Sequence, residues 1–116
     1  MNQERKERLT AAGIDVDGTL MRFMNNEAML EKFWKKFLDE KSYGELCAAV
    51  EAGDTAGAAM AAHTLKGVCG TLGFTRMHGI CLTVEQQLKA GNLEGALQAM
   101  PGLVREYTAV CGLLSE

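Results

Sequence analysis

Apolar residues recur every three or four positions along most of this chain, which is the pattern of amphipathic helices that pack against one another. One stripe alternates spacings of three and four and consists of Phe74, Met77, Cys81, Val84 and Leu88. A second stripe lies in the preceding segment and consists of Ala58, Ala61, Leu65, Val68 and Leu72. We expect both stripes to face a common hydrophobic core.

The N-terminal part of the chain predicts short helices. Residues 3–12 form a charged helical segment that Gly13 should end, and residues 14–16 indicate a brief extended link. Asp17 is the expected N-cap of a second short helix, which runs to Phe23. The longer and more apolar helices are expected after this point.

The first longer helix should begin after the Asn25-Asn26 pair and stop at Gly53. Its apolar face is assigned to Met29, Leu30, Phe33, Phe37 and Leu38, with Trp34 beside that face. Around residues 41–44, which read Lys-Ser-Tyr-Gly, this helix is expected to end or kink.

Three further helices follow. Asp54 is the expected N-cap of the next helix and Gly73 its C-terminal stop. The helix after it ends at residues 90–92, which read Ala-Gly-Asn. Pro101 should break or kink the last helix near Met100, because proline lacks a backbone N–H and crowds the preceding turn.

Short connections between long helices favour antiparallel neighbours. The sequence therefore predicts an all-α fold, an up-down-up-down antiparallel four-helix bundle with short additional N-terminal helices. At 116 residues the chain is expected to be one domain, residues 1–116, in which residues 1–13 are an N-terminal helix and residues 14–116 the core.

Composition narrows the function. The net charge is −3 and no basic stripe is present to neutralise phosphates, so we expect no nucleic acid partner. No run of about 18 apolar residues exists, and no apolar segment follows the charged N-terminus. We therefore expect no membrane span, no signal peptide and a cytoplasmic location, and we expect a monomer.

The four cysteines form no CxxC pair and are predicted to be reduced core thiols. They are Cys47, Cys69, Cys81 and Cys111.

The face opposite the second stripe carries the candidate chemistry. His63 projects from it, with Lys66 and Gly67 three and four residues on and Gly70 two turns on. A glycine inside a helix costs about 1 kcal/mol relative to alanine. Two glycines beside an exposed histidine therefore indicate that another molecule must come close to the imidazole.

These residues resemble a known family, the histidine-containing phosphotransfer (HPt) domain of bacterial two-component phosphorelays. The motif that carries the resemblance is His63-x-Leu65-Lys66-Gly67, preceded by Ala61-Ala62 and followed by Gly70 and Leu72-Gly73. Further similar segments extend over nearly the whole chain and are Gly13-Ile14-Asp15, Leu20-x-Arg22-Phe23, Gly53-Asp54, Cys81-x-x-x-Glu85 and Ala90-Gly91. The departure from the family pattern is Val68-Cys69, where small residues such as Ala or Ser are commoner.

The resemblance implies a role for each matched residue. His63 would be the phosphorylated histidine, Lys66 the cation beside the phosphoryl group, and Gly67 and Gly70 the positions that give a partner clearance. The implied partners are receiver domains of response regulators and a hybrid histidine kinase. A receiver would supply the aspartate and its Mg²⁺, so this chain is expected to need no cofactor and no metal of its own. The chain contains no P-loop, GxxxxGK[ST], which favours a phosphate carrier over an ATP-dependent kinase.

Two other function classes remain open from the sequence. The first is a helical docking or scaffold module that binds a receiver domain without transferring phosphate. The second is a metal or redox protein, for which the four possible zinc ligands are His63, Cys69, His78 and Cys81. Their spacing is unusual for zinc, and Cys69 points away from His63 on the same helix. His78 is predicted to be a half-buried structural histidine rather than a second phosphorylation site.

Overall fold

Helices account for most of the chain in the computed structural model, which describes residues 1–116. The elements are α1 (Gln3–Ala11), α2 (Val16–Arg22), α3 (Glu27–Lys36), the 3-10 turn η1 (Phe37–Asp39), α4 (Ser42–Glu51), α5 (Thr55–Leu72), α6 (Thr75–Lys89) and α7 (Leu93–Leu114). No strand forms, so the predicted all-α class is confirmed.

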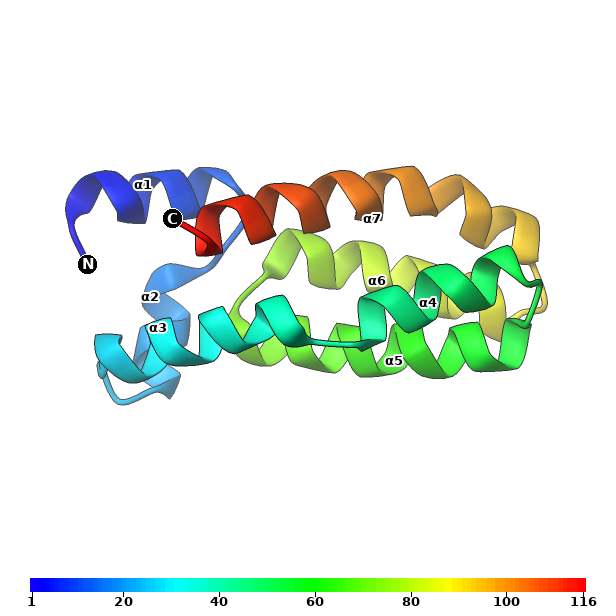
Figure 1. The fold of residues 1–116 in the computed structure, drawn as a ribbon, viewed down its shortest axis with the longest axis horizontal. Coiled ribbons are helices and arrows are strands. Elements are labelled where there is room, and N and C mark those ends of the chain that lie inside the picture. Colours follow the sequence, from blue (N-terminus) through cyan, green and yellow to red (C-terminus); the bar gives the residue numbers. More distant parts are fainter.

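The longer helices lie side by side along an elongated molecule of 43 × 21 × 20 Å. α5 packs against both α4 and α6, and α6 packs against α7. In Figure 1, α4, α5, α6 and α7 follow the long axis, and successive helices run in alternate directions. This arrangement leaves one long side of α5 free of the other helices.

The link between α1 and α2 is bound to the loop between α5 and α6. The backbone N–H of Asp15 donates to the carbonyl oxygen of Gly73 at 2.8 Å, and Ile14 pairs with Phe74 in an isolated β-bridge. Asp15 is also the N-cap of α2, because its side chain accepts a bond from a backbone N–H of the first turn. The prediction that Asp17 caps this helix is wrong, since Asp17 already lies within that turn.

The buried face of α3 and η1 differs from the predicted one. Its buried members are Leu30, Trp34 and Phe37, whereas Met29, Phe33 and Leu38 are exposed. Trp34 lies at the centre of this face rather than beside it. Its indole Nε1 donates a hydrogen bond to the carbonyl oxygen of Leu72 at 2.9 Å. A buried indole N–H needs such a partner, and the end of α5 supplies it.

Two predictions on helix continuity have opposite outcomes. The predicted interruption of the first long helix is confirmed, but it lies at residues 37–41 rather than 41–44, because η1 follows α3 and α4 begins at Ser42. Of the break or kink predicted at Pro101, the break is wrong, because α7 continues through this residue, and the kink stays a prediction. Ala96 and Leu103 are buried on either side of Pro101. Packing of both halves of α7 therefore outweighs the cost of the proline, which is about 3 kcal/mol in a helix interior.

The two apolar stripes form the core largely as predicted. All five residues of the α6 stripe are buried, which confirms that prediction. In α5 the buried row is Ala58, Ala62, Leu65, Cys69 and Leu72. Ala61 and Val68, which were assigned to the row, are only half-buried, because they border hollows between α5 and the α3–α4 segment.

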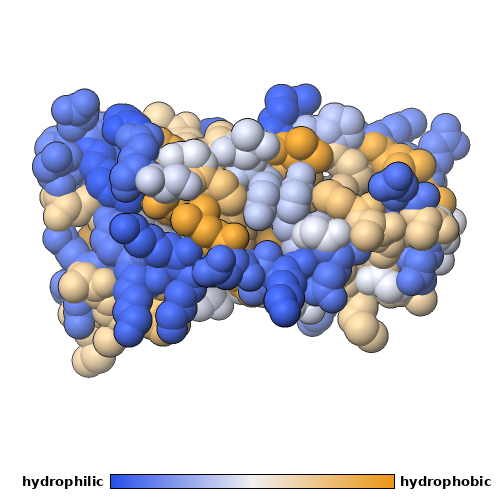
Figure 2. All heavy atoms as spheres, viewed as in Figure 1, coloured by the Kyte–Doolittle hydropathy of each residue, from blue (hydrophilic) through white to orange (hydrophobic).

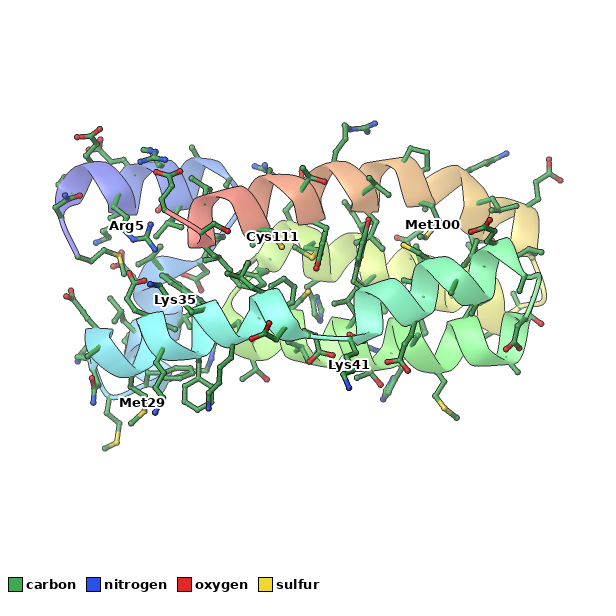
Figure 3. All side chains as sticks on the ribbon, viewed as in Figure 1. Arg5, Met29, Lys35, Lys41, Met100 and Cys111 are labelled. Atoms are coloured by element: carbon green, nitrogen blue, oxygen red, sulfur yellow. The ribbon has the colours of Figure 1, made fainter.

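The N-terminal helix is tied to both α3 and the C-terminal end of α7. Arg5 lies between α1 and α3 (Figure 3), and its guanidinium donates to both carboxylate oxygens of Glu31 at 2.9 and 3.1 Å. The same guanidinium donates to the carbonyl oxygen of Leu113 at 3.2 Å, and Arg8 pairs with Glu116. Hydrophilic side chains cover α1 and α3 in Figure 2. None of the helices combines the length and the apolar character needed to cross a membrane.

Candidate functional site

His63 projects from the outer face of α5, and 66 % of its side chain is exposed. Its Nδ1 lies 2.7 Å from Oε2 of Glu85, which comes from α6. A carboxylate can only accept a hydrogen bond, so this contact places the imidazole proton on Nδ1. The lone pair of the neutral ring is then on Nε2, the nitrogen that Glu85 does not bind. The ring is thus oriented by one nitrogen and nucleophilic at the other.

Glu85 is a buried carboxylate held by three donors. Only 3 % of its side chain is exposed. Lys66 Nζ lies 2.6 Å from Oε1, and Lys89 Nζ lies 3.1 Å from Oε2, the oxygen that His63 also binds. Burial alone would raise the pKa of Glu85, but the hydrogen bonds from Lys66, Lys89 and His63 outweigh it and lower the pKa to about 2. The carboxylate is therefore ionised at neutral pH.

Lys66 is brought to the site, where it contacts Glu85, and its role as the cation beside a phosphoryl group stays a prediction. Its side chain is 22 % exposed and its ammonium pairs with Glu85. Lys89, with 63 % of its side chain exposed, pairs with the same carboxylate. The cluster beside His63 therefore holds one carboxylate and two ammonium groups. Its net positive charge favours an added phosphoryl group.

The two glycines of the motif have different surroundings. A Cβ atom at Gly67 would have no neighbour within 4 Å, so this position is open as predicted. Gly70 is also exposed, but a Cβ atom there would lie 3.3 Å from Cδ2 of His78, so a larger side chain would meet this imidazole. The carbonyl oxygen of Gly70 also accepts a hydrogen bond from Arg22 at 3.2 Å. Gly70 thus gives room to an imidazole of the same chain.

The remaining histidine and the cysteines do not join this cluster. His78 is half-buried against Gly70, as predicted for a structural residue. Cys69 and Cys81 are buried, and none of the four cysteines forms a disulfide. No group of three or more His, Cys, Asp or Glu side chains is arranged to hold a metal ion. The four residues considered as zinc ligands are therefore not brought together.

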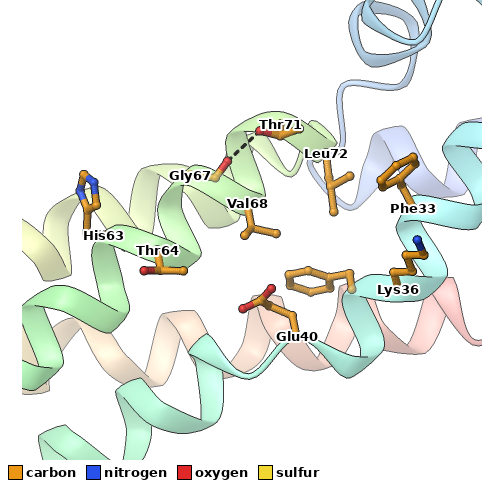
Figure 4. A pocket seen from close by; sticks show the side chains of 10 residues that line it. Phe33, Lys36, Glu40, His63, Thr64, Gly67, Val68, Thr71 and Leu72 are labelled. Carbon is orange, nitrogen blue, oxygen red and sulfur yellow. Dashed lines mark hydrogen bonds between the residues drawn. The ribbon is translucent and has the colours of Figure 1, made fainter.

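A groove of about 550 Å³ lies beside His63, between α5 and the α3–η1 segment. In Figure 4, Thr64, Val68 and Leu72 of α5 face this groove, and Phe33, Lys36 and Glu40 lie opposite them. The complete lining is Phe33, Lys36, Phe37, Glu40, His63, Thr64, Gly67, Val68, Thr71 and Leu72. The groove has an apolar floor with one ammonium and one carboxylate on its rim.

Comparison with known proteins identifies the family. The family model described as "Hpt domain" matches residues 29–112. The chain belongs to the Hpt domain family. A search of curated proteins and a search of solved structures returned no match.

Hpt domains are phosphotransfer modules of two-component phosphorelays and interact with receiver domains. Membership therefore gives this chain a part in phosphorelay signalling. The matched segment contains all of α4, α5 and α6, and with them His63, Lys66, Glu85 and Lys89. The match extends through most of the bundle and is not confined to the histidine motif.

Sequence reasoning missed two members of the Hpt site, Glu85 and Lys89. Glu85 was noted only as part of a family-like segment. Its position contains a signal, because it falls between Val84 and Leu88 on the buried face of α6. An acidic residue on a buried face needs charged partners, and Lys89 lies one turn further along the same row.

Proposed function

We propose that this Hpt domain carries a phosphoryl group on Nε2 of His63. It accepts the group from the aspartyl phosphate of one receiver domain, such as that of a hybrid histidine kinase, and passes it to another. The observation that carries this proposal is the exposed imidazole whose Nδ1 is bound by the buried Glu85 carboxylate, which leaves Nε2 free. The carrier is an up-down-up-down bundle in which α3 and α4 together form the first helix.

Transfer on this chain requires positioning and charge rather than a cofactor of its own. The Nε2 lone pair attacks phosphorus in line with the aspartyl oxygen, which leaves as a carboxylate. Lys66 and Lys89 offset the negative charge that arrives with the phosphoryl group. Mg²⁺ belongs to the receiver and acts there. We infer that the chain has no ATP-dependent kinase activity.

The groove between α5 and α3–η1 supports docking of a whole receiver domain at His63. It leads from the histidine to Phe33, which is 41 % exposed although it is a large apolar residue. Phe33 also lines a second hollow, which contains Met24 and Met29 and continues the apolar surface (Figure 3 labels Met29). Such a contiguous exposed apolar surface is typical of protein interaction sites.

Incubation with a phosphorylated receiver tests the carrier function. We expect radiolabel on the wild-type chain, none on His63→Gln and undiminished label on the matched control His78→Gln. The label should be labile in acid and stable in base, as a phosphoramidate is. Label that persists in His63→Gln would contradict the assignment. A receiver that binds but never transfers phosphate would instead favour the docking or scaffold module.

Receiver docking gives a separate prediction at Phe33. Phe33→Ala should weaken receiver binding by about tenfold. Truncation of an aromatic residue that anchors an interface costs roughly 1 to 2 kcal/mol or more, and about 1.4 kcal/mol corresponds to a factor of ten in affinity. The control is Leu97→Ala, which removes a similarly exposed apolar side chain from α7. Binding is measured by titration calorimetry. Equal affinities for the two variants would show that the groove is not part of the interface.

A further inference from the structure

A hollow of about 350 Å³ lies between α4 and α5, which run side by side in Figure 1, and we call it the α4–α5 hollow. Its apolar walls include the exposed Met60 and two half-buried alanines, Ala49 and Ala61. Thr64 lines both this hollow and the groove beside His63. A protein that docks at His63 along the groove therefore lies next to the α4–α5 hollow as well.

Two polar side chains of the hollow have no partner within the chain. Ser42 is 1 % exposed, yet its hydroxyl makes no hydrogen bond. Because Ser42 lines the hollow and is buried, it belongs to the floor of the hollow. Glu45 is exposed at the rim, one turn further along α4, and forms no ion pair. A buried hydroxyl without a partner is costly, so its presence here indicates that a group from outside the chain binds it.

The charge of the hollow indicates which kind of group fits. The charged residues that line it are both acidic, Glu45 and Asp54. Asp54 accepts a hydrogen bond from the backbone N–H of Gly57 at 2.9 Å but pairs with no cation. No group of three or more His, Cys, Asp or Glu side chains is arranged to hold a metal ion. An organic cation with an apolar stem matches both the acidic rim and the apolar walls.

We propose that the α4–α5 hollow is a subsite of the receiver interface that takes one arginine or lysine side chain of the docked receiver. The apolar stem of that side chain lies against Ala49 and Ala61, and its charged end donates hydrogen bonds to Glu45 and to Oγ of Ser42. This inference rests on the proposed function. It adds a chemical feature that a receiver must present beside the residues that face His63.

One cationic head group can serve both polar side chains at once. A carboxylate only accepts hydrogen bonds, and a serine hydroxyl can accept one as well. An ammonium group has three donors and a guanidinium group has five, so the same head group reaches Glu45 and Ser42 together. A receiver without a basic side chain at this place would leave the hydroxyl of Ser42 unpaired under the interface. The subsite therefore discriminates among receivers, since an unpaired polar group opposes the wrong partner.

A small cation tests the subsite on the full chain without any partner protein. The probe is n-butylguanidinium chloride at millimolar concentration, and n-butylurea is its uncharged counterpart. We expect butylguanidinium, but not butylurea, to shift the backbone amide signals of Ser42, Glu45 and Ala61 in ¹H–¹⁵N spectra. Glu45→Gln should weaken this binding by about fivefold. Shifts spread over the whole surface, or equal shifts with the two compounds, would overturn the proposal.

Charge reversal extends the test to a receiver domain that binds the wild-type chain. Glu45→Lys should weaken receiver binding by about tenfold, because it places like charges side by side. The matched control is Glu51→Lys, which makes the same charge change at an exposed position of α4 that does not line the hollow. In the receiver, one Arg→Glu or Lys→Glu change should restore affinity for Glu45→Lys. Equal affinities of the Glu45→Lys and Glu51→Lys variants in titration calorimetry would overturn the proposal.

The hydroxyl of Ser42 gives a second variant with two readouts. Ser42→Ala should weaken receiver binding by about threefold, because a hydrogen bond to a charged group is lost. Its midpoint of urea unfolding should not fall, since the hydroxyl has no bond to lose within the chain. Unchanged receiver affinity would overturn the proposal, and so would a lower unfolding midpoint, which would show that the hydroxyl is bonded within the fold.

These measurements separate the subsite from the proposed function. Binding of butylguanidinium and of an unphosphorylated receiver requires no phosphotransfer. Dependence of both on Glu45 would support the subsite even if no receiver ever phosphorylated His63. A receiver that phosphorylates His63 but binds the Glu45→Lys and Glu51→Lys variants equally well would overturn the subsite and leave the carrier function intact.

Discussion

At the scale of single residues, the site is built around a buried charge. An ionised carboxylate out of water is costly unless it is paired and hydrogen-bonded. Glu85 meets that requirement with Lys66, Lys89 and His63. In doing so it orients the imidazole and holds two ammonium groups next to it. A single acidic residue thus organises the chemistry of an otherwise exposed histidine.

Removal of Lys66 should slow phosphotransfer while the fold is retained. Lys66→Ala removes one ammonium beside the incoming phosphoryl group, and partial exposure limits the effect to about 1 kcal/mol, or about fivefold in rate. Lys89→Ala should have a smaller effect, because its side chain is far more exposed. Single-turnover transfer from a phosphorylated receiver measures both. Wild-type rates in the two variants would show that neither lysine assists transfer.

Substitution of Gly67 tests more directly than substitution of Gly70 whether a partner needs open space beside His63. Nothing lies within 4 Å of a Cβ atom at Gly67, so Gly67→Ala should stabilise the isolated domain by up to about 1 kcal/mol. Gly67→Leu should also fold, yet it should slow transfer strongly, because the side chain enters the space from which a receiver reaches His63. Denaturant unfolding and transfer rates are measured on the same samples. Normal transfer by a folded Gly67→Leu variant would contradict the clearance argument.

At the scale of helices, the sequence correctly predicted the features that depend on local patterns of residues. The α6 stripe, the interruption before α4 and the caps at Asn26 and Asp54 all follow from periodicity and capping chemistry. The buried face of α3 did not follow, because apolar residues occupy two adjacent rows of this helix. Contacts with other helices distinguish the buried row, among them the hydrogen bond from Trp34 to the end of α5 and the ring contact of Phe37 with Phe74. The partnership of Glu85 with His63 likewise depends on how α6 is placed along α5, which no local pattern specifies.

Pro101 lies inside α7, although proline disfavours the interior of a helix, and its substitution gives a prediction. Pro101→Ala restores a backbone N–H in α7 and removes crowding in the preceding turn, while the unfolded chain gains some freedom. The net effect should be a gain of about 2 kcal/mol in the free energy of unfolding. The control is Gln98→Ala, an exposed change in the same helix that should stay within about 0.5 kcal/mol. Urea unfolding followed by circular dichroism compares them. A destabilised Pro101→Ala variant would show that α7 requires the proline geometry.

At the scale of the whole molecule, functional and stabilising contacts overlap. α5 and α6 make the most extensive helix contact of the bundle, and the Glu85 cluster lies along it. The apolar residues of that contact lie beneath the cluster, among them Leu65, Cys81 and Val84. Loss of the Glu85 charge should therefore be detected in global unfolding as well as in phosphotransfer.

The stability of the whole domain should fall in acid because of Glu85. The folded protein holds the pKa of Glu85 at about 2, below its ordinary value of 4.5. A lowered pKa contributes stability that is complete above the ordinary value and is lost as pH falls toward 2. The contribution is on the order of 3 kcal/mol, because the carboxylate is buried.

Urea unfolding at a series of pH values from neutral to acid measures this loss, since urea, unlike guanidinium, does not screen ion pairs. The decline between about pH 4.5 and pH 2 should be shallower in Glu85→Gln than in the wild type. Glu116→Gln is the matched control. The pairing of Glu116 with Arg8 also lowers a carboxyl pKa, but both side chains are well exposed, so its loss should change the decline far less. Parallel declines in the wild type and Glu85→Gln would mean that the buried carboxylate does not govern the acid sensitivity of the fold.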